Sequence, residues 1–184
     1  HRDATWSIQN ITNIPEGQRI EATYQGKSYT YDLSVLGRHW AMNSGGILLS
    51  LIKMGGDLAQ GLHDLKTFTE PLGRGKCHLH PWKNGDIMII DESYNGAPPS
   101  MEAAFAVLSQ RSQNRSGRSI AVLGDMLELG DESPRYHRDL KIPLIREKID
   151  LVLTYGTFMK NLQDNLPRHM QGGHYEDLAL LSQD

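Results

Sequence analysis

Apolar and polar residues alternate along residues 4–33, a stretch that is rich in residues favouring β-strands. Gly17 and Gly26 interrupt the alternation, and the segment YQGKSY around the second glycine has the composition of a hairpin turn. The pattern predicts a small antiparallel β-meander.

A helical pattern follows over residues 39–54, and a second, shorter one covers residues 57–65. Gly45 and Gly46 lie inside the first segment and weaken it by about 1 kcal/mol each relative to alanine. The apolar residues at approximately helical spacing in this segment are Met42, Ile47, Leu48, Leu51 and Ile52. Periodicity is lost near residues 66–73, where Pro and Gly are frequent, and we expect a boundary between two domains there.

Strand and helix patterns alternate after this boundary. Strands are expected at residues 86–91, 119–124 and 150–156, and the first two are apolar runs typical of strands buried on both faces. The helices expected between and after these strands are 99–110, 133–148 and 157–166. The order predicts an α/β fold: a Rossmann-like, doubly wound domain with a mostly parallel sheet, preceded by the β-meander and its helix.

Prolines mark two of these helices. Pro99 lies in the first turn of its helix. The apolar face of that helix is expected to consist of Met101, Ala104, Phe105 and Leu108. In the next helix we expect Ser133 as the N-cap and Pro134 in the first turn, and we expect Pro143 to kink or split the helix.

Composition narrows the class of protein. Of the 184 residues, 39% are apolar and 22% are charged, which suits a globular fold. The net charge of −3, without a long run of one sign, argues against a nucleic-acid partner. The apolar runs are too short to span a membrane, and a signal peptide pattern is absent. The single cysteine, Cys77, excludes an intrachain disulfide and suits a reducing compartment. The chain opens without Met and stops directly after a helical pattern, so we expect a fragment of a longer protein.

Candidate chemistry lies where the predicted strands end. The three ends are Asp91-Glu92-Ser93-Tyr94-Asn95, Gly124-Asp125-Met126 and Thr154-Tyr155-Gly156. Ligands of parallel α/β sheets bind outside the carboxyl ends of the strands, and acids there accept hydrogen bonds from ribose or lie near a metal. The alternative is that the acids only cap the following helices or face solvent, and the spacing does not decide between the two.

Other motifs give weaker evidence of function. Cys77, His78 and His80 offer three ligands where a zinc site needs four, and alternation separates the cysteine from both histidines, so we expect no metal site. A G-x-x-x-x-G-K-[ST] phosphate loop is absent from the sequence. On their own, His39 and Asn43 are ordinary helix positions.

Several segments together resemble the Mur ligase family, and within it the MurF type. They are GRHWAMNSGGIL, GRGKCH, IIDESYNGAPPSMEAAFAVL, IAVLGDMLELGDES and VLTYG, in the family's order. The resemblance covers residue 35 to the end well, with residues 1–34 as a β-meander of the family's central domain. It implies that residues 1–68 are the C-terminal part of the central ATP-binding domain. Residues 69–184 would then be the Rossmann-like C-terminal ligase domain, truncated at its end.

The resemblance also implies a reaction, in which an ATP-dependent ligase of peptidoglycan precursor synthesis joins D-alanyl-D-alanine to UDP-MurNAc-tripeptide through an acyl phosphate. The implied parent is a monomer of the bacterial cytoplasm that uses ATP and Mg²⁺. Its phosphate loop and its metal ligands lie upstream of residue 1. We therefore expect no catalytic and no metal-binding residue in this chain, and we expect the chain alone to be inactive.

The implied ATP-binding residues come from both domains. Asn43 matches the adenine-contacting Asn of the family's H-N-x-x-N motif, to which His39 also belongs. Arg74 matches an arginine that reaches the ribose and the phosphates. Glu92, with Asp91 beside it, matches an acid that accepts ribose hydroxyls. The remaining two residues expected to shape this pocket are Tyr94 and Asn95.

The sequence departs from the family pattern at Trp40, which replaces the first Asn of that motif, so stacking or packing is expected in place of a hydrogen bond. The Gly45-Gly46 pair replaces residues that are usually Ala-like. Three further matched positions are expected to have structural roles or to shape the dipeptide site: Asp125, Glu128 and His137.

Two alternatives remain open. One is another Mur-superfamily ligase such as a folylpolyglutamate synthetase, against which the SYN…SM and GDMLELG segments argue. The other is a non-catalytic Rossmann-like binding module that was never part of an ATPase.

Overall fold

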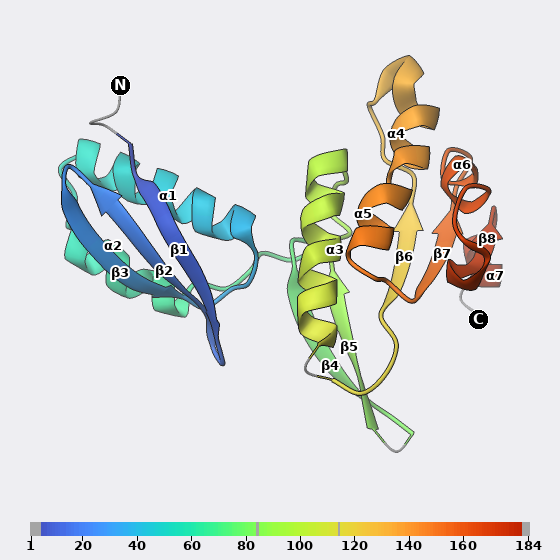
Figure 1. The fold of residues 1–184 in the computed structure, drawn as a ribbon, viewed down its shortest axis with the longest axis horizontal. Helices are drawn as coiled ribbons and strands as arrows, with labels where there is room; N and C mark the ends of the chain where they lie inside the picture. The colour runs from blue at the N-terminus through green and yellow to red at the C-terminus, as the bar shows by residue number, and fades with distance from the viewer. Residues whose placement is uncertain (1–4, 84, 114, 182–184) are drawn as a thin grey trace. The chain divides into compact units, whose positions relative to one another are not determined.

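The computed structural model describes residues 5–83, 85–113 and 115–181, and it divides into two compact units, His1–Pro71 and Leu72–Asp184. Figure 1 shows the helices and strands of each unit. No helix in the part of the chain so described is long and apolar enough to cross a membrane.

The first unit begins with three antiparallel strands in the order β1-β2-β3, which confirms the predicted meander. The strands are β1 (Ser7–Ile14), β2 (Gly17–Tyr24) and β3 (Lys27–Leu33). The turn between β2 and β3 has positive φ at Gln25 (49°) and Gly26 (74°), the conformation that a two-residue hairpin loop requires. Ala4, the first residue of the predicted range, lies outside the described residues.

Two helices pack against this sheet: α1 (Arg38–Lys53) and α2 (Leu58–Asp64), followed by a 3₁₀ turn, Leu65–Thr67. The Asp57 carboxylate caps α2 by accepting hydrogen bonds from the N–H groups of Ala59 and Gln60. The predicted apolar face of α1 is only partly correct. The residues of α1 that are buried are Ala41, Ser44, Gly45 and Leu48, whereas the side chains of Met42 and Ile47 are more than half exposed.

The side of α1 that meets the sheet carries small residues because a large aromatic side chain fills the space. A Cβ atom added to Gly45 would lie 2.9 Å from Cδ1 of Trp6. The Trp6 ring is buried between the rings of Tyr24, Tyr29 and Tyr31, at centroid distances of 5.0–6.1 Å. The core of this unit therefore forms around Trp6.

The second unit begins with an antiparallel ribbon of two strands, β4 (Lys76–Trp82) and β5 (Gly85–Asp91). Strand β4 was not predicted, because KCHLHPW contains a proline and lacks β-branched residues. The prediction that β5 is buried on both faces of a parallel sheet is wrong. Its hydrogen-bonded neighbour is β4, and Ile87 and Ile89 are 42% and 47% exposed, because a two-stranded ribbon cannot cover both of its faces.

Helix α3 (Pro98–Ser112) follows the ribbon and confirms the helix predicted at 99–110. The Ser100 hydroxyl oxygen accepts a hydrogen bond from the Ala97 N–H at 2.9 Å and so caps the first turn. Phe105 is buried in the core of the unit, and Met101 and Leu108 pack against the same cluster, as the predicted apolar face requires.

A parallel sheet in the order β6-β7-β8 forms the centre of this unit and confirms the α/β class. Its strands are β6 (Ile120–Gly124), β7 (Leu151–Tyr155) and β8 (Gln171–Tyr175), the last of which was not predicted. The strand order follows the chain, so these three strands do not contain the reversal of a doubly wound sheet. The expectation that β6 is buried on both faces is wrong, because Val122 is 61% exposed whereas Leu123 is 6% exposed.

The helix predicted at 133–148 is split in two. Its parts are α4 (Ser133–Asp139) and α5 (Lys141–Arg146), with Pro143 in the first turn of α5. Pro143 has no N–H to donate to the preceding turn, which explains why the helix divides before it. A 3₁₀ turn, Gly130–Glu132, leads directly into α4, so Ser133 is its first residue and not the predicted N-cap. The helix predicted at 157–166 is shorter, α6 (Lys160–Gln163), and the last elements are a 3₁₀ turn, Arg168–Met170, and α7 (Leu178–Leu181).

Candidate functional site

Two turns of the second unit meet at the end of the β4–β5 ribbon and bring together five of the expected site residues. The Gly75 N–H donates to the Asp91 carbonyl at 2.8 Å, and the Tyr94 N–H donates to the Gly73 carbonyl at 3.2 Å. Gly73 has a φ of 71°, and a Cβ atom added to it would lie 2.9 Å from the backbone nitrogen of Tyr94. The close approach of the turns therefore depends on glycine at this position.

The Arg74 side chain stacks on Tyr94. Its Cζ atom lies 4.4 Å from the centroid of the phenol ring, within the range of a cation–π interaction. Arg74 is exposed and Tyr94 is 69% exposed. The pair therefore forms a cationic surface that an anion can reach.

The acids and the amide of the second turn have local partners. The Asp91 carboxylate accepts a hydrogen bond from the Ser93 N–H at 3.0 Å, and the side chain and N–H group of Ser93 lower the pKa of Asp91 below its usual value. Asn95 Oδ1 accepts from the Gly96 N–H at 2.9 Å. Glu92, which stands between these two residues in the sequence, is half-buried. Asp91 and Asn95 thus stabilise the turn, and their expected contacts with a nucleotide stay predictions.

The first unit holds the other two expected residues, His39 and Asn43, one turn apart on α1. Asn43 is exposed. His39 is half-buried, and its Nδ1 atom is buried and has no hydrogen-bond partner among the described residues. Burial lowers the pKa of His39, so its ring is neutral at neutral pH. A neutral imidazole and an amide on one helix surface are suited to hydrogen bonding with the base of a nucleotide.

Trp40 takes part in packing where the family pattern has an amide. Its ring centroid lies 5.1 Å from that of Phe68 and 5.4 Å from that of His39. The expectation that packing replaces a hydrogen bond at this position agrees with these contacts. That the residues of the two units serve a single nucleotide stays a prediction.

The acid at the end of β6 has a structural role. The Asp125 carboxylate accepts hydrogen bonds from the N–H groups of Phe158 at 3.1 Å and Met159 at 2.8 Å, and so ties the end of β6 to the segment after β7. His137 holds the same loop from the other side. Its Nε2 atom accepts from the Met126 N–H at 2.8 Å, and its Nδ1 atom lies 2.6 Å from the Ser133 carbonyl. Asp125 thus holds the turn that follows β7, and it does not cap the helix that follows its own strand.

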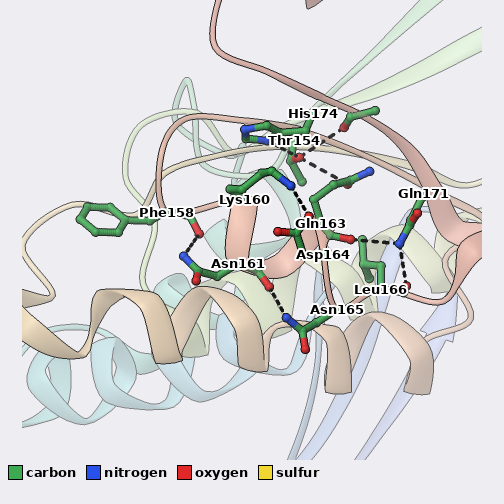
Figure 2. A network of polar contacts seen from close by, with 11 residues as sticks. Thr154, Phe158, Lys160, Asn161, Gln163, Asp164, Asn165, Leu166, Gln171 and His174 are labelled. Atoms are coloured by element: carbon green, nitrogen blue, oxygen red, sulfur yellow. Dashed lines mark hydrogen bonds and ion pairs between the residues drawn. The ribbon is translucent and has the colours of Figure 1, made fainter.

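The ends of β7 and β8 carry a polar network that the sequence did not reveal (Figure 2). The hydroxyl of the fully buried Thr154 lies 3.0 Å from Nδ1 of His174 and 3.2 Å from the Gly173 carbonyl. The Gln171 amide donates to the carbonyls of Gln163 and Leu166, at 3.1 and 2.9 Å. The network joins β8 to the segment around α6, which gives it a structural role. Only a prediction of β8 would have indicated His174.

Metal ligands are not clustered in the described ranges, where no group of three or more His, Cys, Asp or Glu side chains is placed to hold an ion. The rings of His78 and His80 stack at 6.3 Å between centroids on the β4–β5 ribbon.

Comparison with known proteins gives consistent matches. Residues 79–183 match the family model described as "Mur ligase, glutamate ligase domain". A UDP-N-acetylmuramoyl-tripeptide–D-alanyl-D-alanine ligase of Bacillus subtilis is 30% identical over 174 residues, which are 93% of this chain and 35% of that protein. The ligase of the same name from Rickettsia prowazekii is 27% identical over 90% of this chain and 36% of its own length. The chain thus spans about a third of the length of these relatives.

Solved structures show the same fold. MurF from Acinetobacter baumannii aligns with a TM-score of 0.78 at 22% identity, over 97% of this chain and 38% of that one. MurF from Thermotoga maritima in complex with ADP aligns with a TM-score of 0.77 at 19% identity, over 98% of this chain and 39% of that one. At these identities the likeness establishes the fold.

Proposed function

The chain belongs to the Mur ligase family, and on that premise we propose that it is part of an ATP-dependent ligase joining D-alanyl-D-alanine to UDP-N-acetylmuramoyl-tripeptide. One observation carries the proposal: similarity to the Bacillus subtilis ligase of that name extends over 93% of this chain. In the proposed protein, residues 1–68 belong to the central ATP-binding domain and residues 69–184 to the C-terminal ligase domain. The division into two compact units at Pro71 supports this assignment.

The reaction requires activation of a carboxylate, because an amine does not displace hydroxide from it at neutral pH. ATP transfers its γ-phosphoryl group to the terminal carboxylate of the tripeptide, which yields an acyl phosphate and ADP. The amino group of D-alanyl-D-alanine attacks the acyl carbon. The tetrahedral intermediate expels phosphate, the nitrogen loses a proton, and the amide remains. Phosphoryl transfer of this kind depends on positioning and on neutralisation of charge.

The residues of this chain would act on the nucleotide and not at the reacting carbon. Arg74 would place positive charge beside the phosphates, and Asp91 and Glu92 would accept hydrogen bonds from the ribose. His39 and Asn43 would contact the adenine. Magnesium prefers several oxygen ligands, and the described part of the chain contains no group of three side chains suited to hold it. We therefore assign no step to a metal held by these residues.

The test is amide synthesis by the full-length protein encoded by the same gene. The protein is incubated with ATP, UDP-N-acetylmuramoyl-tripeptide and D-alanyl-D-alanine, and mass spectrometry follows the pentapeptide product together with ADP. We expect one ADP for each amide formed. A parallel reaction with folate and glutamate tests the folylpolyglutamate synthetase alternative, and product in that mixture alone would overturn the proposal. Absence of turnover in both mixtures would favour the non-catalytic binding module.

A further inference from the structure

The stack of Arg74 on Tyr94 is built by the backbone of two separate turns. The Tyr94 N–H donates to the Gly73 carbonyl, and the Gly75 N–H donates to the Asp91 carbonyl, so the residues on either side of Arg74 are both anchored. A side chain on Gly73 would collide with Tyr94, since its Cβ atom would lie 2.9 Å from Cβ of the tyrosine. The ring is thus held directly beside the start of the Arg74 side chain.

Neither Arg74 nor Tyr94 is part of a hydrophobic core. Tyr94 is 69% exposed and belongs to neither buried cluster of the described residues. No carboxylate in the described ranges lies within ion-pair distance of the Arg74 guanidinium. Asp91, the acid of the adjoining turn, accepts its hydrogen bond from Ser93 instead. The cation therefore has an aromatic partner and, among the described residues, no carboxylate beside it.

That arrangement suits a phosphate ligand. A guanidinium group binds phosphate through parallel N–H donors that lie in its own plane. An aromatic ring can contact the flat face of the same group. The contact with the Tyr94 ring, 4.4 Å from Cζ to the centroid, limits the rotamers that the long arginine side chain can adopt. An anion that binds there does not need to order the arginine first.

We propose that Tyr94 is a positioning residue for Arg74, whose guanidinium it holds ready for a phosphate of the bound nucleotide. The inference rests on the proposed function, since it takes the nucleotide to be ATP. Tyr94 acts through Arg74 and does not itself touch the nucleotide. The aromatic face is what matters in this arrangement, so the hydroxyl group is dispensable.

The experiment uses the full-length protein and five forms of it: wild type, Tyr94→Phe, Tyr94→Leu, Arg74→Ala and the double variant Tyr94→Leu/Arg74→Ala. The dissociation constant for ADP is measured by calorimetry, and KM and kcat for ATP are measured in the ligase reaction. A second tyrosine, Tyr136, provides the control, although unlike Tyr94 it also packs against the core of its unit. Arg135 stacks on Tyr136 at 5.0 Å, but this arginine is already paired with Glu132, so Tyr136→Leu should leave nucleotide binding unchanged.

We expect Tyr94→Leu to raise the ADP dissociation constant and the KM for ATP about two- to fivefold, the range of an exposed cation–π contact. The KM for D-alanyl-D-alanine should not change. Tyr94→Phe should behave as wild type. In the Arg74→Ala background the leucine substitution should have no further effect, because Tyr94 then has no cation to hold. A purely structural role would instead change every KM and the melting temperature.

Two results would overturn the inference. One is wild-type nucleotide affinity in Tyr94→Leu, and the other is an equal loss with and without Arg74. The first proposal and this one fail in different ways. A protein that binds ADP with the expected variant pattern but forms no amide would end the proposed function alone. An active ligase with unchanged affinity in Tyr94→Leu would end the positioning role alone, and a full-length protein that binds no nucleotide would end both.

Discussion

The imidazole of His137 shows how one buried polar residue can fix a loop. The side chain is completely buried, and its two ring nitrogens meet one backbone donor and one backbone acceptor. Because Nε2 accepts from the Met126 N–H, the ring proton is on Nδ1 and is donated to the Ser133 carbonyl. The loop after β6 is thereby attached to the start of α4.

The first prediction concerns His137→Phe, which keeps a ring of similar size but removes both hydrogen bonds. We expect it to lower the free energy of unfolding by about 2–4 kcal/mol, because the buried Met126 N–H loses its partner and the Ser133 carbonyl loses its hydrogen bond to the imidazole. Urea denaturation measures the change. His63→Phe, at an exposed position of α2, should stay within about 0.5 kcal/mol of wild type. Similar losses in the two variants would contradict this explanation.

Helix α1 contains two adjacent glycines, of which one is packed against a side chain and the other is open. Gly45 faces the ring of Trp6, whereas a Cβ atom added to Gly46 would meet no atom of the described residues within 4 Å beyond its chain neighbours and the nearby helix backbone. The reason for glycine at the first position is therefore packing. At the second position the local structure gives no steric reason for it.

The second prediction compares Gly45→Ala with Gly46→Ala. Alanine at the open position should raise the free energy of unfolding by about 0.5–1 kcal/mol through helix propensity. Alanine at the packed position must displace Trp6 and should lower stability by about 1–3 kcal/mol, as overpacking of a core does. Thermal or urea denaturation of both variants gives the comparison. Stabilisation by both substitutions would show that Trp6 adjusts at no cost.

The beginnings of β6 and β7 are joined by a side chain that titrates. The Asp150 carboxylate accepts hydrogen bonds from the N–H and the hydroxyl of Ser119, at 2.7 and 2.8 Å. These bonds, the backbone one first, lower the pKa of Asp150 below its usual value. The contact therefore favours the ionised and folded state.

The third prediction follows from the sign of that shift. A carboxyl group with a lowered pKa stabilises the fold above its ordinary value of about 3.9, and the stabilisation disappears as the pH falls through the lower, folded-state pKa. We expect Asp150→Asn to be less stable than wild type at a pH of about 6, and the difference to shrink towards a pH of about 2. Urea midpoints across that range measure it. A difference that is independent of pH would exclude titration as the cause.

At the scale of the whole molecule, the expected nucleotide contacts of this chain are few. Each neutral hydrogen bond contributes about 0.5–1.5 kcal/mol net, whereas millimolar binding already needs about 4 kcal/mol. The sequence contains no phosphate-cradling loop that would add to them.

The fourth prediction is that the 184-residue chain hydrolyses no ATP and binds it with a millimolar or weaker dissociation constant. Isothermal titration calorimetry measures the affinity, and release of phosphate from ATP measures the activity. The full-length protein is the control and should bind at least tenfold more tightly, since in the proposed ligase further phosphate contacts lie outside these 184 residues. A low micromolar constant for this chain would show that its own residues suffice.

Prediction succeeded where the signal was local and failed where it depended on neighbours. Gly26 in the hairpin and Pro99 in the first turn of α3 act through their own backbone, and the elements that they mark are present. The apolar run of β5 was misread because IMII is compatible with a central strand and with a ribbon alike. Asp91 ends β5 and Asp125 follows β6, yet only the groups that each carboxylate contacts show its role.

The sequence by itself determined the class of fold and the family, because these depend on periodicity, on turn residues and on ordered motifs along the chain. Only the tertiary structure decided which acids act as caps, why Gly45 faces Trp6, and that Arg74 lies on Tyr94. Those facts depend on contacts between residues distant in sequence, whose geometry is set when the turns and strands pack together and is not encoded in any single segment.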